Sequence, residues 1–285
     1  MSKAIYDVIV IGAGIEGSSS AYNLAKRGKK VLLLEQFPLP HSRGSSHGQS
    51  RITRYAYADE FYVRMMVDAF PMWAELERES GENFFVNCGL LDLHLANSKT
   101  ITKVTSSLKA HDVPHEVISP GELKRRFPHF KAGDNCAGVW DPSGGLLRAD
   151  RALKAFQTVF QKLGGGHRIC LHQGAITDPD ERDKVEEDSW ILEEVKRILA
   201  LTFDNLENQP AIREYCMYTN TPDHHPYIDR HSTFPNIVIA AGFSGHGFKL
   251  APAVGKAVSE LVLNDTFTYN MEPFKLNRFS TKANL

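Results

Sequence analysis

The chain has 285 residues, of which 42% are hydrophobic and 24% charged, and its formal net charge is −1 at pH 7. This composition is typical of a globular protein with a sizeable core, in one large or two modest domains, and it gives no electrostatic reason to expect nucleic acid or a membrane surface as a partner. The longest apolar runs are strand-sized and the N-terminus lacks a secretion-signal pattern, so neither a membrane span nor secretion is expected. The four cysteines have no paired spacing, so neither a disulfide framework nor a cysteine-based zinc site is expected.

The first segment of the chain predicts a dinucleotide-binding unit. An apolar strand at residues 7–11 leads into Gly12-Ala13-Gly14-Ile15-Glu16-Gly17, a helix follows that ends at Gly28, and a second strand at residues 31–34 stops on Glu35. In such a unit the first glycine permits a tight turn, the second lets the backbone approach a pyrophosphate, and the third lets the helix lie close to the strand. The amides at the helix N-terminus then bind the phosphates. The acid that ends the second strand, with no arginine directly after it, suits an unphosphorylated ribose, which favours FAD or NAD over NADP.

The middle of the chain departs from a regular alternation of strands and helices. Residues 37–54 form a polar loop rich in glycine and serine, which has the character of a functional segment, and a helix is expected over residues 61–76. The apolar runs at residues 84–86 and 90–95 are expected to pair as antiparallel strands, with which a second layer begins. A further amphipathic helix is expected over residues 150–163, where three glycines end it.

The last third of the chain predicts a second glycine loop. A mostly charged run at residues 178–188 is expected to be a solvated loop, and residues 211–218 have the pattern of a strand. A buried strand at residues 237–242 runs into a glycine-rich loop at residues 243–249, and a helix follows over residues 251–262. This arrangement could place a second set of backbone amides over a ligand. The nearby group of possible metal ligands fits no metal motif, so no metal site is predicted from His224, His225, Asp229 and His231.

Three longer motifs occur in order along the chain. They are Gly44-Ser45-Ser46-His47-Gly48-Gln49-Ser50-Arg51, Cys216-Met217-Tyr218-Thr219-Asn220-Thr221-Pro222-Asp223 and Ala241-Gly242-Phe243-Ser244-Gly245-His246-Gly247-Phe248-Lys249-Leu250-Ala251-Pro252. They resemble the sarcosine oxidase and pipecolate oxidase family of flavoproteins, most closely its peroxisomal eukaryotic members, and the resemblance covers residues 1–166 and 168–285. In that family FAD is held covalently by a cysteine, and secondary amino acids such as sarcosine or pipecolate are oxidised to imines while oxygen is reduced to hydrogen peroxide.

The resemblance implies a role for particular residues. Cys216 would be the thioether anchor to the flavin, His47 and Arg51 would lie against the flavin, and Arg54 and Lys249 would hold the substrate carboxylate, which needs fixed cations because it must be desolvated. The residues implied at the reacting centre are Arg54, Lys249, His47, Arg51, His172 and Arg168. Those implied to bind FAD are Gly12, Ala13, Gly14, Ile15, Glu16, Gly17, Glu35, Ser46, His47, Arg51, Cys216, Gly242, Gly245, Gly247 and Lys249.

The resemblance also implies reactants and a location. The substrate would be a small secondary amino acid and the electron acceptor molecular oxygen. The chain ends in Ala283-Asn284-Leu285, which resembles the small, polar, leucine tripeptide of peroxisomal proteins. A peroxisomal location and a peroxisomal import receptor as partner are therefore expected.

The chain is shorter than the family pattern. Full members are longer by about 100 residues, the length of a small domain, and the missing part falls between Gly166 and His172. It includes a strand that ends in a turn beside the FAD, several strands of the substrate-covering sheet and a tyrosine that contacts substrate. Arg168 would take the place of the lysine that promotes reaction with oxygen, and His172 that of a substrate-site histidine; an arginine keeps the charge without the compact ammonium. Loss of strands from within a sheet is expected to leave an unpaired edge and an exposed apolar face.

The sequence therefore predicts an α/β protein with a Rossmann-like FAD-binding domain and a second, antiparallel-sheet substrate domain that is truncated. The FAD-binding domain is expected to comprise residues 1–82, a helix at 149–166 and a C-terminal part at 221–285, while the substrate domain comprises residues 83–148 and a remnant with a connecting segment at 167–220. Two functions compete: a working FAD-dependent amine oxidase, and a non-catalytic form with impaired flavin or substrate binding. A nicotinamide dehydrogenase would have no use for Cys216 or for the second glycine loop.

Overall fold

The computed structural model describes residues 5–131, 133–169 and 219–279, and the single positions 193, 196, 197 and 200. Several expectations lie outside these residues: the charged run at 178–188, the strand at 211–218, His172, Cys216 and the C-terminal tripeptide. Within the described residues the predicted class is confirmed, because a parallel sheet with its helices is combined with antiparallel sheets.

A parallel sheet of three strands forms the N-terminal unit. It contains β1 (Val8–Ile11), β2 (Val31–Glu35) and β9 (Gly166–Ile169) in the order β1-β2-β9. Helix α1 (Ile15–Lys26) connects the first two strands and ends before Gly28, whose φ of +76° is left-handed, as the glycine stop predicts. The place of β9 corrects one expected boundary, since residues 167–169 pair with β2 and so extend the FAD-binding sheet instead of starting the substrate-domain remnant.

The strand β1 is covered on one face only. Val8 and Val10 pack against the core of the unit, whereas Ile9 and Ile11 are 56% and 86% exposed. Within the described part of the chain β1 pairs with β2 alone. A parallel strand is normally buried on both faces, so this exposure is the result expected when a neighbouring strand and its cover are missing.

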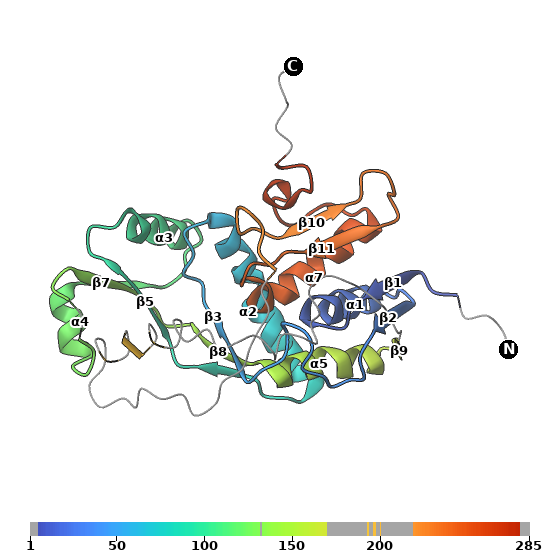
Figure 1. The fold of residues 1–285 in the computed structure, drawn as a ribbon, viewed down its shortest axis with the longest axis horizontal. Coiled ribbons are helices and arrows are strands. Elements are labelled where there is room, and N and C mark those ends of the chain that lie inside the picture. The colour runs from blue at the N-terminus through green and yellow to red at the C-terminus, as the bar shows by residue number, and fades with distance from the viewer. Residues whose placement is uncertain are drawn as a thin grey trace, which may run out of the picture.

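Four helices form the centre of the molecule: α1, α2 (Glu60–Ser80), α5 (Ala149–Lys162) and α7 (Gly247–Leu263) (Figure 1). Helices α5 and α7 pack on α1, and α2 packs on α5 and α7. The helices α1 and α7 approach closely, since Ser19 Oγ donates to the Ala251 carbonyl at 2.7 Å and a Cβ on Gly255 would lie 2.3 Å from Ser19 Oγ. Helix α7 begins four residues before the predicted start at Ala251, because burial of Phe248 and Leu250 outweighs the low helix propensity of Gly247. This brings Lys249 into the first turn.

Two antiparallel sheets form the other end of the molecule (Figure 1). One has the order β3-β8-β4, from β3 (Ser50–Thr53), β8 (Gly145–Arg148) and β4 (Phe85–Asn87). The other has the order β5-β7-β6, from β5 (Leu90–Leu95), β7 (Cys136–Asp141) and β6 (Glu116–Ile118), with α3 (Lys99–Ala110) and α4 (Pro120–Arg126) beside it.

The expected pairing of the two strands at residues 84–95 is wrong. The strand β4 pairs with β8, and β5 pairs with β7. Between them Gly89 adopts a φ of +70° and lies against the Trp140 ring, to which a Cβ would come within 2.1 Å. The chain therefore crosses from one sheet to the other instead of forming a hairpin.

The C-terminal part adds a hairpin, β10 (Tyr227–Arg230) with β11 (Val238–Ala241), and a short 3-10 helix η2 (Glu272–Phe274). The strand β11 is only partly buried, contrary to the expectation of a buried strand, since among the described residues it pairs with β10 alone. None of the described helices is long and apolar enough to cross a membrane.

Candidate active site

The first glycine turn has the close contacts that the motif requires. Gly12 has a φ of +99° and donates its N–H to the Leu34 carbonyl at 2.8 Å. A Cβ on Gly17 would lie 1.8 Å from the Gly12 carbonyl oxygen, so only glycine permits this approach of helix and strand. A Cβ on Gly14 would lie 3.0 Å from Ser46 Oγ. These glycines therefore let the strand, the helix and the segment at Ser46 approach one another as closely as the motif requires.

The acid at the end of β2 lies beside this turn. Glu35 Oε2 accepts the Ala13 N–H at 2.8 Å, and Glu35 Oε1 accepts the N–H groups of Gln36 at 2.8 Å and Phe37 at 3.2 Å. A carboxylate has about four acceptor positions, so capacity for a ribose hydroxyl remains. These residues fit the adenosine part of FAD.

The polar segment expected as a loop over residues 37–54 ends in β3 at Ser50–Thr53, and the part before β3 folds over the N-terminus of α1. Ser46 Oγ accepts the Ile15 N–H at 2.9 Å. The Arg51 guanidinium donates to the carbonyls of Ser45 at 2.9 Å and His47 at 2.6 Å, and it lies 5.6 Å from the centre of the Phe248 ring. Arg51 thus holds this loop in shape and connects it to α7. His47 Nδ1 bonds to the Gly44 carbonyl, which fixes the imidazole within the same loop.

The two cations expected to hold a carboxylate lie together. Arg54, directly after β3, and Lys249, in the first turn of α7, both face the ring of Tyr57, at 5.2 Å and 5.8 Å from its centre. Burial, and then the charge of Arg54, lower the pKa of Lys249 to about 8. Among the described residues the Lys249 ammonium has no hydrogen bond or ion pair, whereas Arg54 has Asp92 at 3.6 Å. Two partly buried positive charges with one anionic partner form a site for a further anion.

Polar atoms around this pair lack partners as well. In the described part of the chain, Tyr57 OH, Arg54 Nε and His246 Nδ1 are buried without a hydrogen bond. The imidazole of His246 stacks on Tyr62 at 4.7 Å, and burial, followed by the charge of Lys249, lowers the pKa of His246 to about 4, so it is neutral at neutral pH. Buried polar atoms are rarely unsatisfied, so this group has the character of a polar ligand site.

Three residues of this site escaped sequence reasoning. Both cations lie near the ring of Tyr57, Asp92 neutralises part of their charge, and His94 lies 3.2 Å from Asp92. The signal for Asp92 and His94 is present in the strand at residues 90–95, where both alternate with leucine and so share one face. No local pattern marks Tyr57.

The backbone carries the cations at defined positions. The buried carboxyl of Asp141 accepts the Tyr55 N–H at 2.7 Å, which holds the segment after Arg54. Trp73 Nε1 donates to the Lys249 carbonyl at 3.1 Å and so ties the first turn of α7 to α2. Both cations are therefore set by the core of the protein rather than by a surface loop.

The second glycine loop, residues 242–247, meets the first glycine turn. A Cβ on Gly247 would lie 2.6 Å from Glu16 Oε1, and both Glu16 carboxyl oxygens are buried without a partner among the described residues. Burial raises the pKa of Glu16 well above its usual value. The two segments predicted to bind the cofactor are thus adjacent, although more than 200 residues separate them in the sequence.

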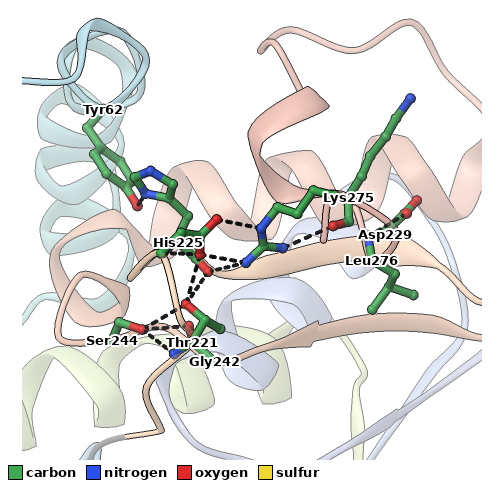
Figure 2. Close-up of polar contacts among 10 residues, drawn as sticks. Tyr62, Thr221, His225, Asp229, Gly242, Ser244, Lys275 and Leu276 are labelled. Atoms are coloured by element: carbon green, nitrogen blue, oxygen red, sulfur yellow. Dashed lines mark hydrogen bonds and ion pairs between the residues drawn. The ribbon is translucent and has the colours of Figure 1, made fainter. Parts of the chain in front are cut away.

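The conformation of this second loop depends on the turn that precedes β10. Gly242, Ser244 and Gly245 are left-handed, with φ of +70°, +48° and +85°. Ser244 Oγ accepts the Thr221 N–H at 3.0 Å and can donate to the Gly242 carbonyl at 3.1 Å, while the Ser244 N–H donates to the Thr219 carbonyl at 3.1 Å. Figure 2 shows Thr221, Gly242 and Ser244 joined in this way.

Three other predicted site residues either lie outside the described part of the chain or lie in a different element. Cys216 and His172 lie outside the described residues. Arg168 lies in β9, where its backbone is in register with Leu34 at the far side of β2 from β1. In the described part of the chain, no group of three or more histidine, cysteine, aspartate or glutamate residues could hold a metal ion.

Comparison with known proteins finds relatives over nearly the whole chain. The family model described as FAD dependent oxidoreductase matches residues 7–175 and 165–261. The human peroxisomal sarcosine oxidase is 34% identical over 386 aligned residues that cover 99% of each chain, and the mouse protein of the same name is 35% identical over 384, covering 98% of each. Among solved structures, L-proline dehydrogenase from P. horikoshii has a TM-score of 0.82 at 22% identity and covers 96% of this chain and 98% of its own. That likeness shows the fold.

The alignments also locate the shortening. The alignment with the human protein spans 386 positions, whereas this chain has 285 residues. The human protein therefore has residues inside the matched region that are missing here. The two stretches of the family match meet at residues 165–175. The omission predicted between Gly166 and His172 falls in this interval.

Proposed function

Because the chain belongs to the sarcosine oxidase family of FAD-dependent oxidoreductases, we propose that it acts on small secondary amino acids such as sarcosine or L-pipecolate. The observation that carries this proposal is the partly buried pair of Arg54 and Lys249 against Tyr57, next to the junction of the two glycine segments. A carboxylate is the anionic group common to these substrates. It would complete the charge balance that Asp92 leaves incomplete.

The protein residues bind and orient the substrate. Arg54 and Lys249 hold the carboxylate end, and Tyr57 OH offers a further hydrogen bond. The neutral imidazole of His246 avoids a third positive charge beside the substrate nitrogen, which must be unprotonated when it is oxidised. FAD, when bound, would supply the two-electron chemistry, in which the substrate loses two electrons and two protons to become an imine and oxygen gains the equivalent to become hydrogen peroxide. The contribution of the chain is therefore position, exclusion of water and fixed positive charge.

We infer that the flavin is attached through Cys216. Support comes from Thr219, three residues later, whose carbonyl accepts the Ser244 N–H of the second glycine loop. Protein bands on a denaturing gel should fluoresce after acid treatment, and Cys216→Ser should abolish the fluorescence. Release of all flavin by acid from the unmutated chain would contradict the anchor.

A second candidate is a form with impaired binding and little turnover. The exposure of Ile9 and Ile11 favours it, since these side chains mark the face that a covering segment would bury. Part of the wall that holds substrate over the flavin would be missing with that segment, and a displacement of about 1 Å can cost about 100-fold in rate. We expect the shortened chain to be the weaker oxidase.

One experiment tests both candidates. The chain and a version with the relatives' internal segment restored would be assayed for bound flavin and for hydrogen peroxide formation on sarcosine, pipecolate and proline, with dimethylamine as an amine that lacks the carboxylate. Peroxide formation that requires the carboxylate supports the oxidase. A restored, flavin-loaded protein that is inactive on every secondary amino acid would refute it, and equal turnover by the two versions would refute the impairment.

A peroxisomal location is proposed from the C-terminal Ala283-Asn284-Leu285 and from the names of the human and mouse relatives. Fusion of the C-terminal residues to a fluorescent protein should give a punctate signal that coincides with a peroxisomal marker. A diffuse cytosolic signal would contradict recognition by the import receptor.

A further inference from the structure

The last described segment of the chain is held by one arginine. Arg278 Nε donates to Asp223 Oδ2 at 2.7 Å, and its Nη2 donates to Asp223 Oδ1 at 3.0 Å and to the His225 carbonyl at 2.7 Å. Its Nη1 donates to the Lys275 carbonyl at 3.0 Å. The guanidinium also lies 3.9 Å from the centre of the Tyr227 ring. The Arg278 side chain is 10% exposed and that of Asp223 is 27% exposed, so the arginine of this two-bonded pair is largely shielded from water and the carboxylate partly so.

The carboxylate of Asp223 also bonds to other residues of the turn before β10, so it connects Arg278 to that turn. Its Oδ1 accepts the His225 N–H at 3.1 Å and the Thr221 hydroxyl at 3.2 Å. The single Thr221 hydroxyl proton is shared between this carboxylate and the His225 carbonyl, which is nearer at 2.7 Å. His225 Nδ1 in turn bonds to Tyr62 OH at 2.9 Å (Figure 2). The hydrogen bonds from Arg278 are the main reason that the pKa of Asp223 lies far below its usual range, so the carboxylate stays ionised. The turn is thus bonded both to the C-terminal segment and to α2.

The same turn holds the second glycine loop. Thr221 N–H donates to Ser244 Oγ, and the Thr221 methyl group lies against Gly242, where a Cβ would come within 2.6 Å of it. Ser244 has a φ of +48°, a conformation that residues other than glycine rarely adopt unless surrounding contacts hold them. The contacts of Ser244 with Thr221, Thr219 and Gly242 are such contacts.

We propose that Arg278 is a positioning residue for the second glycine loop: through Asp223 and Thr221 it holds Ser244, and so residues 242–247, in the conformation that faces the cofactor site. The identification of FAD as the ligand whose binding depends on this loop rests on the proposed function. The conformation of the loop itself can be measured without any ligand. Arg278 contacts neither glycine segment, so its effect passes through the bonded chain of residues.

Arg230 provides a matched control. It also uses its guanidinium to bind backbone carbonyls, those of Pro235 and Leu261, and it donates to Asn264 Oδ1 at 2.9 Å. These contacts hold the far end of α7 and the connection between β10 and β11, and they involve none of Asp223, Thr221 or Ser244. Arg230→Met therefore removes a comparable set of bonds without touching the route to the loop.

The first measurement is hydrogen exchange of the amides of residues 242–247 in the full chain without flavin. Arg278→Met should speed this exchange by about tenfold or more, because it removes charge-assisted hydrogen bonds. Arg278→Lys should have a smaller effect, since an ammonium cannot form the two-bonded pair. Arg230→Met should leave exchange in this loop unchanged, even where it lowers the melting temperature as much. Equal exchange of the loop in the unmutated chain and in Arg278→Met, or equal acceleration by Arg230→Met, would overturn the proposal.

The second measurement is the Kd for added FAD, from quenching of flavin fluorescence in the Cys216→Ser background. Arg278→Met should raise this Kd about tenfold and Arg230→Met should not change it. Should Arg278→Met fail to fold, Thr221→Val interrupts the same route at its centre and should produce the same two effects, and unchanged exchange and Kd in that variant would overturn the proposal. Failure of the unmutated chain to bind FAD would refute the proposed function, whereas the exchange data would still decide the role of Arg278.

Discussion

Replacement of Lys249 by methionine should have opposite effects on stability and on substrate binding. The ammonium of Lys249 is buried beside Arg54 without a partner of its own among the described residues, and its pKa falls from 10.5 to about 8. Each unit of pKa corresponds to about 1.4 kcal/mol, so the charge costs the folded protein up to about 3 kcal/mol. Methionine has a similar length and no charge. Lys249→Met should therefore raise the free energy of unfolding at pH 7 by an amount of this order.

The pH dependence of this gain follows from the sign of the shift. Between pH 8 and 10.5 the unfolded chain binds more protons at this lysine than the folded chain does, so the stability of the unmutated protein rises with pH over this window. The cost of the charge is complete below pH 8 and disappears above pH 10.5. The stabilisation by Lys249→Met should decline across the same range.

Binding should change in the other direction. A substrate carboxylate that loses one of two desolvated cations should bind more weakly by about 2–5 kcal/mol. Urea unfolding at pH 7 and pH 10 would measure stability, and KM with competition by simple carboxylates, in the version with the restored segment, would measure binding. Lys256→Met is the control, because Lys256 lies on the same helix but has Asp68 at 3.2 Å, so its loss should not stabilise. A Lys249→Met protein that is less stable at pH 7, or that binds carboxylates as before, would refute this account of the site.

Three further changes test other parts of the site. Gly17→Ala should abolish FAD binding and destabilise the fold, since its Cβ would lie 1.8 Å from the Gly12 carbonyl oxygen. Gly28→Ala, at a φ of +76° in open space, should lower the free energy of unfolding by only about 1 kcal/mol. Equal losses by the two variants in flavin titration and thermal melts would contradict the packing role of Gly17. Glu16→Gln should stabilise the protein at pH 7. In the unmutated protein the Glu16 carboxyl keeps its proton in the folded state and loses it in the unfolded state as pH rises from about 4.5 toward the raised pKa of Glu16, so stability falls over this window, and the substitution should reduce that fall. Parallel curves of urea stability against pH for the two proteins would refute this. Asp92→Asn should raise the affinity for simple carboxylates, by about tenfold, because it removes the anion that competes for Arg54, and a weaker inhibition by acetate would show that Asp92 supports binding instead.

The sequence by itself predicts the dinucleotide-binding unit, since each of its parts is local. The turn at Gly12, the end of α1 at Gly28 and the acid at Glu35 depend on backbone conformations and spacings within 30 residues. The amphipathic helices α2 and α5 follow from their periodicity in the same way, and both are observed within a few residues of the predicted bounds. The cation pair is predicted through the family resemblance, and the structure brings Arg54 and Lys249 to one ring.

Only the tertiary structure decides which of these segments meet. The pairing of β4 with β8 and of β5 with β7 depends on the packing of Gly89 against Trp140, and the start of α7 depends on burial of Phe248, so neither follows from local propensity. The partnership of Arg278 with Asp223 joins residues 55 positions apart, and Glu16 meets Gly247 across most of the chain. Such contacts depend on the burial and desolvation that all elements produce together, and the spacing of residues in a sequence contains no record of that burial.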